Sequence, residues 1–230
     1  MWQYTYLVIN FFTIIICFIF SFHPKIKFHR HFKAFLFGSV ITAVFFIAWD
    51  VWFTANGVWW FNDKYLIGKR LFGLPIEELL FFICIPFSCV FTYFCLDKFF
   101  KLDWKPSIEK IFVIFSIICC FILAVIFKDK IYSFVTFLTT AITLIALYFV
   151  LKVKWIGKAS FIYLILMPGF LAVNGILTGT GLESPIVNYN PEDFIGFRIL
   201  TIPVEDTVYG YEMILWNLFF FHKFKKDEQD

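Results

Sequence analysis

Seven apolar stretches divide this chain, and they constrain its fold more than any other feature. Hydropathy places them over residues 4–22, 34–54, 76–96, 111–127, 132–151, 161–178 and 204–221. A helix needs roughly 20 apolar residues to cross the hydrocarbon core of a bilayer. With 61% hydrophobic and only 16% charged residues, the chain is also too apolar for an ordinary water-soluble domain. The sequence therefore predicts an all-α, polytopic membrane protein with about seven transmembrane helices in a lipid bilayer.

The basic residues predict how this protein lies in the membrane. The segments after the first, third, fifth and seventh stretches carry fourteen Lys and Arg residues, whereas the opposite side carries six. Loops rich in Lys and Arg remain on the cytoplasmic side of a membrane. We therefore expect an integral, multi-pass protein with its N-terminus outside and its C-terminus in the cytoplasm.

The chain also contains an internal repeat. Aligning residues 62–78 with 190–206 without gaps gives six identities in seventeen positions. Further upstream, a shift of 124 residues pairs Asp50 with Asn174. Three helices, one linker helix and three more helices make two parallel repeats, related by an axis along the membrane normal. The predicted units are a first repeat over residues 1–110, a linker helix over 111–131 and a second repeat over 132–230. The identical pairs are Asn62/Asn190, Ile67/Ile195, Gly68/Gly196, Arg70/Arg198, Pro75/Pro203 and Glu77/Glu205.

Each repeat opens its third helix with a proline followed by two adjacent acids, Glu77-Glu78 and Glu205-Asp206. A carboxylate deep in a bilayer costs roughly 2.5–3.5 kcal/mol on insertion scales, and such residues usually serve a function. Two-fold symmetry would bring the acids to opposite walls of one cavity, where adjacent residues point about 100° apart. Only one acid of each pair can therefore face that cavity squarely.

A structural role for the acids stays open at this stage. Prolines at the first helical position and acids in the first turn both suit an ordinary helix N-terminus. In that reading the acids cap their helices at the membrane interface and pair with Arg70 and Arg198. It explains one acid in each repeat more readily than two.

Several further residues are predicted to support the acids. Asp50 and Asn174 are a matched polar pair inside the second and sixth stretches. In the second repeat, Glu205, Tyr209 and Glu212 follow one another at i, i+4 and i+7, which places them on one helix face. We therefore expect Asp50, Asn174, Tyr209 and Glu212 near the acids, together with Arg70 and Arg198.

Four tryptophans gather around the end of the second stretch and allow two interpretations. Trp49, Trp52, Trp59 and Trp60 are typical of an aromatic belt at a membrane interface. The alternative interpretation is a wall of aromatic faces that stabilises a developing cation.

Cofactor and metal motifs are missing from the sequence. It contains no glycine-rich nucleotide-binding motif, no C-x-x-C pair and no histidine spacing typical of a metal site. These motifs are the usual sequence signs of nucleotide, redox and metal sites. We therefore predict no cofactor, no metal and no nucleic-acid partner.

The two acidic motifs resemble the repeated signatures of the integral-membrane lycopene cyclase domain family. In that family the two halves occur as separate subunits or fused, as here, and fungal bifunctional enzymes carry a related domain. The likeness covers both repeats. The residues that carry it are Pro75-Ile76-Glu77-Glu78 with Phe81-Phe82, Ile202-Pro203-Val204-Glu205-Asp206 with Tyr209-Gly210, and the flanking Asn174-Gly175-Ile176-Leu177-Thr178-Gly179 and Arg198.

This resemblance implies a membrane lycopene β-cyclase, an isomerase that closes the linear ends of lycopene into β-ionone rings without net redox change. An acid protonates the terminal double bond, the cation closes on the neighbouring alkene, and a base removes a ring proton. By motif match, Glu77, Glu78, Glu205 and Asp206 would be the catalytic acids and bases, with their individual roles unassigned. A lipophilic carotenoid would be the substrate, and other carotenoid-pathway enzymes would be partners.

Two other classes of membrane protein share this plan of helices. A small-solute transporter with parallel three-plus-one-plus-three repeats is the main alternative, although its prolines would be followed by glutamine and not by acids. A seven-helix retinal protein needs a lysine in its last helix, and residues 204–221 contain none.

Overall fold

The computed structural model describes residues 2–225 and confirms a nearly all-helical fold. The end of the C-terminal charged tail, residues 226–230, lies outside the described part. Single-turn helices occur at Trp2–Tyr4, Phe28–His31 and Asp63–Tyr65, and a π-helical turn at Ala146–Val150 follows α5. The seven α-helices of the described part are α1 (Thr5–Phe20), α2 (Phe32–Ala55), α3 (Ile76–Phe99), α4 (Pro106–Ile126), α5 (Ile131–Ile145), α6 (Ile156–Leu177) and α7 (Val204–Phe224).

Each predicted apolar stretch coincides with one of these helices. Within residues 2–225, six helical segments, those containing α1 to α6, are long and apolar enough to cross a membrane. The seventh, α7, is less apolar because it carries Glu205, Asp206 and Glu212, all of them buried. It contacts α2, α3, α5 and α6, so neighbouring helices shield its polar groups from lipid. The multi-pass membrane fold is therefore as predicted, while the side on which each terminus lies stays a prediction.

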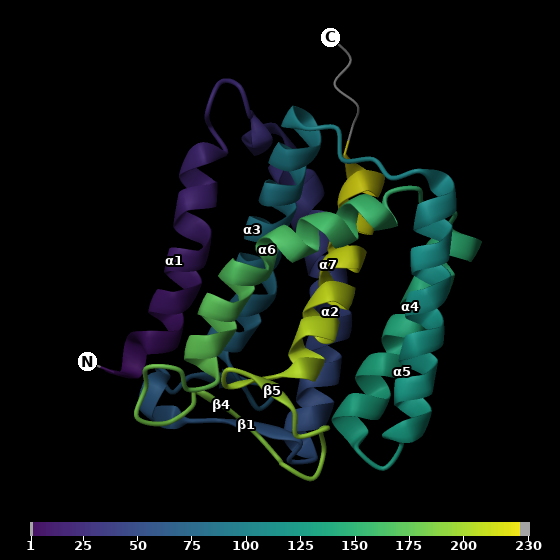
Figure 1. Ribbon diagram of the computed structural model, residues 1–230. Coiled ribbons are helices and arrows are strands. Elements are labelled where there is room, and N and C mark those ends of the chain that lie inside the picture. Colours follow the sequence, from purple (N-terminus) through teal and green to yellow (C-terminus); the bar gives the residue numbers. More distant parts are fainter. Residues whose placement is uncertain (1, 226–230) are drawn as a thin grey trace.

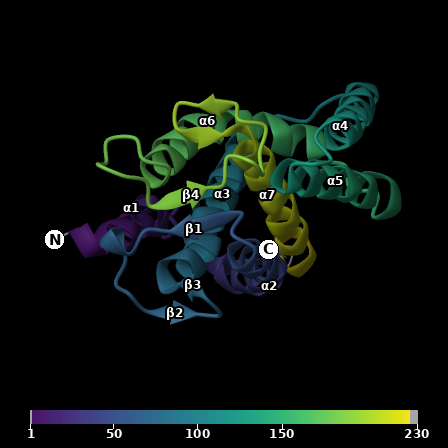
Figure 2. The same ribbon diagram turned by 90° about the horizontal axis from the view of Figure 1, so that it is seen from below.

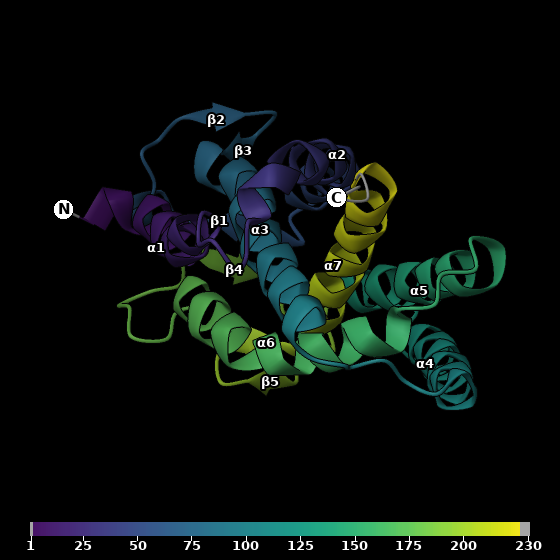
Figure 3. The same ribbon diagram turned by 90° about the horizontal axis from the view of Figure 1, so that it is seen from above.

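The helices form an upright bundle, and two of them, α4 and α5, stand side by side at its edge (Figure 1). α1 packs on α3, α2 packs on α7, and α4 packs on α5 at one side of the bundle. Seen from above, α6 runs across one face, from the side of α1 to the side of α4 and α5 (Figure 3). Pro168 lies inside α6, where its missing N–H weakens the helical ladder.

Two of the three buried hydrophobic clusters of the described chain lie at different levels of this bundle. One aromatic and aliphatic cluster joins α2, α3, α6 and α7 and is centred on residues such as Phe28, Phe87 and Leu215. The other lies beneath the loops near the N-terminus and includes Phe53, Tyr65 and Leu74. The second cluster anchors the loop layer against the helix ends, which positions the site described below.

Short strands in the loops are an addition to the predicted all-α fold. β1 (Trp59–Phe61) and β4 (Val187–Tyr189) pair antiparallel across the end of the bundle that holds the N-terminus (Figure 2). Their register joins Trp59 to Tyr189, Trp60 to Asn188 and Phe61 to Val187. Residues 128 apart are equivalent in the two repeats. Exchanging each residue for its equivalent converts the Trp59–Tyr189 pair into the Val187–Phe61 pair, and it converts the Trp60–Asn188 pair into itself. The two repeats therefore meet around a local two-fold axis through this middle pair, as expected for parallel repeats.

Two equivalent hairpins precede the acidic helices. β2 (Arg70–Leu71) pairs with β3 (Leu74–Pro75), and β5 (Arg198–Ile199) pairs with β6 (Ile202–Pro203). Phe72 and Leu200 occupy matching turn positions with left-handed φ angles of 54° and 58°, and Gly68 and Gly196 have φ angles of 79° and 89°. Left-handed backbone is costly for residues other than glycine, so its recurrence shows that the two loops have matching backbone at these two positions.

The other identical residues of the repeat also make matching turn contacts. The side-chain oxygens of Asn62 and Asn190 each accept a hydrogen bond from the backbone N–H two residues further on. Arg70 and Arg198 each donate to the backbone carbonyl three residues further on. Side chains that bond to nearby backbone in this way stabilise turns. Sequence identity between the repeats therefore marks the scaffold of the loops.

Candidate active site

A cavity of about 310 Å³ lies at the centre of the bundle, between α1, α3, α6 and α7. The β1–β4 pair contributes Trp59, Phe61, Val187 and Tyr189 to its lining. Most of the remaining lining is apolar or aromatic, as in small-molecule sites with a few placed polar groups. This cavity is called the central cavity below.

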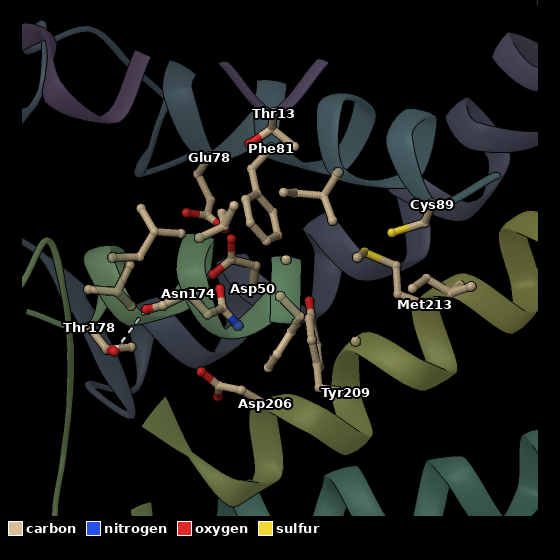
Figure 4. Close-up of a pocket in the computed structure, with 18 of the residues that line it drawn as sticks. Thr13, Asp50, Glu78, Phe81, Cys89, Asn174, Thr178, Asp206, Tyr209 and Met213 are labelled. Atoms are coloured by element: carbon tan, nitrogen blue, oxygen red, sulfur yellow. Dashed lines mark hydrogen bonds between the residues drawn. The ribbon is translucent and has the colours of Figure 1, made fainter. Parts of the chain in front are cut away.

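Three carboxyl groups line the central cavity. Glu78 and Asp206 occupy equivalent positions on α3 and α7, and Asp50 comes from α2. All three are buried. Figure 4 shows Glu78, Asp50, Asp206 and the amide of Asn174 pointing into the same part of the cavity. Of the predicted site residues, these four and Tyr209 are the ones that the structure brings together.

Matching tyrosines hold the two equivalent acids. The Tyr6 hydroxyl donates to Glu78 Oε2 at 2.6 Å, and the Tyr132 hydroxyl donates to Asp206 Oδ1 at 2.5 Å. A second phenol, Tyr189 of β4, donates to Asp206 Oδ2 at 2.8 Å. Burial raises the pKa of the Tyr189 phenol well above its ordinary value, so this group remains a donor. Both oxygens of Asp206 thus accept hydrogen bonds, whereas within residues 2–225 Glu78 accepts one only.

Asp50 is held from one side only. The indole N–H of Trp59 donates to Asp50 Oδ1 at 2.5 Å, and Thr54 lies at 3.4 Å from the same oxygen. Oδ2 of Asp50 is buried and has no hydrogen-bond partner in the described chain. A buried polar atom without a partner is costly, so Asp50 is held less completely than Asp206.

The first acid of each pair has a different environment. Glu77 and Glu205 are fully buried but do not line the central cavity. Glu77 Oε1 accepts the backbone N–H of Ile67 at 2.7 Å, and Glu205 Oε1 accepts that of Ile195 at 2.8 Å. Ser133 also donates to Glu205. Each of these two acids therefore ties the preceding loop to the start of its helix, and a catalytic role for either stays a prediction.

The two predicted arginines lie in the hairpins. Arg70 bonds to the carboxylate of Asp63 at 2.6 Å, and the guanidinium of Arg198 stacks over the ring of Phe194 at 4.7 Å. Neither forms an ion pair with the acids of α3 or α7 among residues 2–225. The alternative in which the acids pair with these arginines is therefore not what the structure shows.

Tyr209 and Glu212 were expected on one face of α7 with Glu205, but the structure separates them. Tyr209 lines the central cavity, and its ring also contacts Trp49 and Phe46 at centroid distances of 5.0 and 5.1 Å. Glu212 lines a second cavity on the other side of α7. Residues at i, i+4 and i+7 are neighbours along a helix surface. Because several helices pack around α7, Tyr209 and Glu212 can still line two different cavities.

The tryptophan cluster divides in the same way. Trp59 is buried and lines the central cavity, and Trp49 lines the second cavity. Trp52 and Trp60 are about half exposed, as residues of an interface belt would be. The exposed pair therefore fits the interface belt, while stabilisation of a cation by the buried members of the cluster stays a prediction.

The tyrosines were not predicted from the sequence, although a signal for them exists. Tyr6 and Tyr132 lie 126 residues apart and make equivalent contacts to Glu78 and Asp206. Extending the repeat alignment to the first helix of each copy would have paired them. Tyr189 has no such signal, because its equivalent in the first repeat is Phe61.

Comparison with known proteins finds similarity in both repeats of the chain. The family model described as Lycopene cyclase matches residues 3–96 and 129–224, one segment in each repeat, with α4 between them. The chain is 36% identical over 74 residues to a bifunctional lycopene cyclase/phytoene synthase of Podospora anserina, which is 31% of this chain and 12% of that protein. A protein of the same description from Leptosphaeria maculans is 34% identical over 58 residues, 25% of this chain and 10% of that protein. The matched part thus spans about a tenth of these relatives. No solved structure matches significantly.

Proposed function

Because the chain belongs to the lycopene cyclase family, we propose that it closes the linear ends of lycopene into β-ionone rings by redox-neutral acid–base catalysis. One observation carries this proposal. Glu78 and Asp206, from equivalent positions of the two repeats, line one buried and largely aromatic cavity. Protonation of an alkene needs a positioned acid, and the resulting cation needs a base and an environment that excludes water.

The hydrogen bonds suggest how the roles divide. A carboxylic acid must present its O–H to the substrate, and Glu78 has one oxygen free of protein donors. It would protonate a carbon of the terminal double bond. The cation would then be attacked by the neighbouring alkene, and the ring cation would lose a proton to Asp206. With both oxygens held by phenols, Asp206 is the better stabilised anion.

Aromatic faces complete the environment for a cation. Phe81 and Tyr209 occupy equivalent positions on α3 and α7, and both line the central cavity with Tyr163 and Phe170. A cation within about 6 Å of an aromatic face is stabilised by the ring quadrupole. The substrate gains one proton from Glu78 and loses one to Asp206, so the product is an isomer of the substrate and no electrons are transferred. Before the next turnover Asp206 must release its proton and Glu78 must take one up.

The size of the cavity suits one end of the substrate. Its volume of about 310 Å³ lies at the lower end of the roughly 300–1,000 Å³ found for small-molecule sites, so most of a long polyene must remain outside. Thr13 of α1 and Gly169 of α6 line the cavity, and Gly169 is exposed. Apart from its chain neighbours and the adjacent backbone of α6, a Cβ at Gly169 would have no atom within 4 Å. We place the entrance from the bilayer between α1 and α6 at this glycine.

Gly169→Phe is therefore expected to obstruct the entrance. A phenyl group at this position would occupy the path of the polyene, and such overfilling should lower lycopene conversion by about tenfold or more. Conversion is measured as ring product per amount of membrane-embedded protein. Ala172→Phe, on an exposed position of α6 outside the cavity lining, is the matched control. Full activity of Gly169→Phe would place the entrance elsewhere.

Expression in cells that accumulate lycopene tests the proposed function itself. We expect cyclised carotenoids to replace lycopene when the full chain is present in the membrane. Persistent lycopene with abundant membrane-embedded protein would contradict the proposal. The pigments formed also distinguish one ring from two.

The orientation in the membrane is part of this proposal. The distribution of Lys and Arg supports an N-terminus outside and a cytoplasmic C-terminus, which places the acids toward the outer side. Reporter fusions at the C-terminus test this orientation.

The matched relatives are described as combining a cyclase with a phytoene synthase. We accordingly propose that this chain associates with other carotenoid-pathway enzymes, a partnership that co-purification from native membranes can test.

A further inference from the structure

The two identical arginines of the hairpins share one contact and differ in their others. Arg70 and Arg198 each donate to the backbone carbonyl three residues further on. Arg70 also forms an ion pair with Asp63 at 2.6 Å. The repeat equivalent of Asp63 is Pro191, and no carboxylate among residues 2–225 forms an ion pair with Arg198. The charge of Arg198 is therefore not neutralised in the way that the charge of Arg70 is.

Arg198 instead lies against two aromatic rings. Its guanidinium carbon is 5.6 Å from the ring centroid of Tyr189 and 4.7 Å from that of Phe194. A cation over an aromatic face is attracted by the ring quadrupole. The first repeat has Phe61 and Leu66 at these two positions, so a phenol beside the arginine is a property of the second repeat alone.

Tyr189 connects this cation to the central cavity. Its hydroxyl donates to Asp206 Oδ2 at 2.8 Å. Its ring is stacked on that of Tyr132 at 5.9 Å, and Tyr132 holds the other oxygen of Asp206. Arg198 interacts electrostatically with both Tyr189 and Asp206. A nearby positive charge favours an anion, and it polarises a hydrogen bond to that anion, so the phenol becomes a stronger donor.

The opposite wall of the cavity holds its acid without such a cation. Phe61 has no hydroxyl to offer Glu78, which accepts one hydrogen bond where Asp206 accepts two. The first repeat also has a second carboxyl, Asp50, where the second repeat has the neutral amide of Asn174. Glu78 and Asp50 interact electrostatically, and two negative charges repel. Negative charge is therefore better stabilised on the wall of the second repeat.

We propose that Arg198 is a positioning residue for the cyclisation: acting through Tyr189, it keeps Asp206 in the ionised form that accepts the ring proton. This assignment rests on the proposed function. The same charge assists the step after cyclisation, in which Asp206 releases its proton, because a nearby cation favours the carboxylate. The identical Arg70 shares only the contact that stabilises its hairpin.

Other titratable groups also face Asp206, from its own helix and from three others. None of them can carry a positive charge, so they do not replace the charge that is lost when Arg198 is removed. These groups are Tyr132 on α5, Tyr163 on α6, Glu205 and Tyr209 on α7, and Glu78 on α3.

Infrared spectroscopy of the purified full chain in detergent tests this proposal. The carboxyl band of Asp206 is identified by its absence in Asp206→Asn, and its protonation is followed as the pH is lowered. In Arg198→Gln we expect Asp206 to become protonated at a pH about one unit higher, a tenfold change in its ionisation constant. Arg198→Lys keeps the charge and should restore most of the natural behaviour.

The first repeat supplies the matched control. Arg70→Gln removes the same contact to a hairpin carbonyl, but it should leave the protonation of Asp206 unchanged. Equal shifts in Arg70→Gln and Arg198→Gln would overturn the proposal, because loosening of a hairpin would then explain both. No shift in Arg198→Gln would overturn it as well.

A second variant tests the connection through Tyr189. Tyr189→Phe removes the hydroxyl and should also raise the pH at which Asp206 becomes protonated. Adding Arg198→Gln to this variant should have a clearly smaller effect than it has in the natural protein, since coupled residues are not additive. Full additivity would show that Arg198 does not act through Tyr189.

Conversion of lycopene then shows whether this coupling serves the reaction. Arg198→Gln should convert less lycopene on the acidic side of neutral pH and recover on the alkaline side, where Asp206 is ionised without the cation. An equal loss at every pH would contradict the positioning role. The infrared measurement does not depend on ring formation, so failure of the coupling is distinguishable from failure of the proposed cyclase activity.

Discussion

Glu78→Gln is expected to abolish ring formation while the protein remains folded in the membrane. The amide has nearly the same shape and can still accept the Tyr6 hydroxyl, but it cannot deliver a proton. Loss of a general acid or base typically costs about 100- to 10,000-fold in rate. Asp206→Asn should lower the rate by a similar factor, because the ring cation then lacks its base. Conversion of lycopene per amount of membrane protein measures both.

Isotope exchange separates the two roles. With Asp206→Asn in heavy water, Glu78 could still deuterate the terminal double bond, and the cation would revert by losing a proton, so recovered lycopene should gain deuterium. Glu78→Gln should give no such exchange. Exchange in Glu78→Gln and none in Asp206→Asn would reverse the assignment. Full activity in both variants would remove the central carboxyls from the chemistry.

Glu205→Ala is expected to destabilise the fold strongly, whereas Glu205→Gln is expected to be tolerated. Alanine leaves the partly buried N–H of Ile195 and the buried hydroxyl of Ser133 without their acceptor. An unsatisfied buried donor costs about 1–3 kcal/mol. Glutamine keeps a carbonyl oxygen that can accept both donors. Thermal unfolding in detergent measures the difference.

The first repeat supplies the parallel experiment, and an exposed residue supplies the control. Glu77→Ala should behave like Glu205→Ala, because Ile67 would lose its acceptor in the same way. Glu183→Ala, at an exposed loop position, should leave the unfolding temperature nearly unchanged. A Glu205→Gln protein that is as stable as the natural one but forms no rings would show that Glu205 takes part in the chemistry.

The four acids illustrate how far repeat analysis reaches. Glu77 and Glu205 are the identical pair, and they perform identical backbone tasks in two matching loops. Glu78 and Asp206 are only similar, and they line the cavity from opposite repeats with different numbers of donors. A shared loop conformation demands the same residue twice, whereas an asymmetric site requires its two halves to differ. Identity between the repeats therefore pointed to the region of the site and not to the acids that line it.

The sequence alone determined the membrane class, the helices, the repeat and the end of the bundle at which the acids gather. These follow from chain-local properties, because apolar length and the spacing of identical residues need no knowledge of packing. Which acid faces the cavity depends on how each helix is rotated about its axis, at about 100° per residue, and packing against neighbours sets that rotation. Packing also brought Tyr189 and Trp59 from the loops onto Asp206 and Asp50. Only the tertiary structure could place Glu212 in a separate cavity, because contacts between distant helices decide on which side of α7 each space lies.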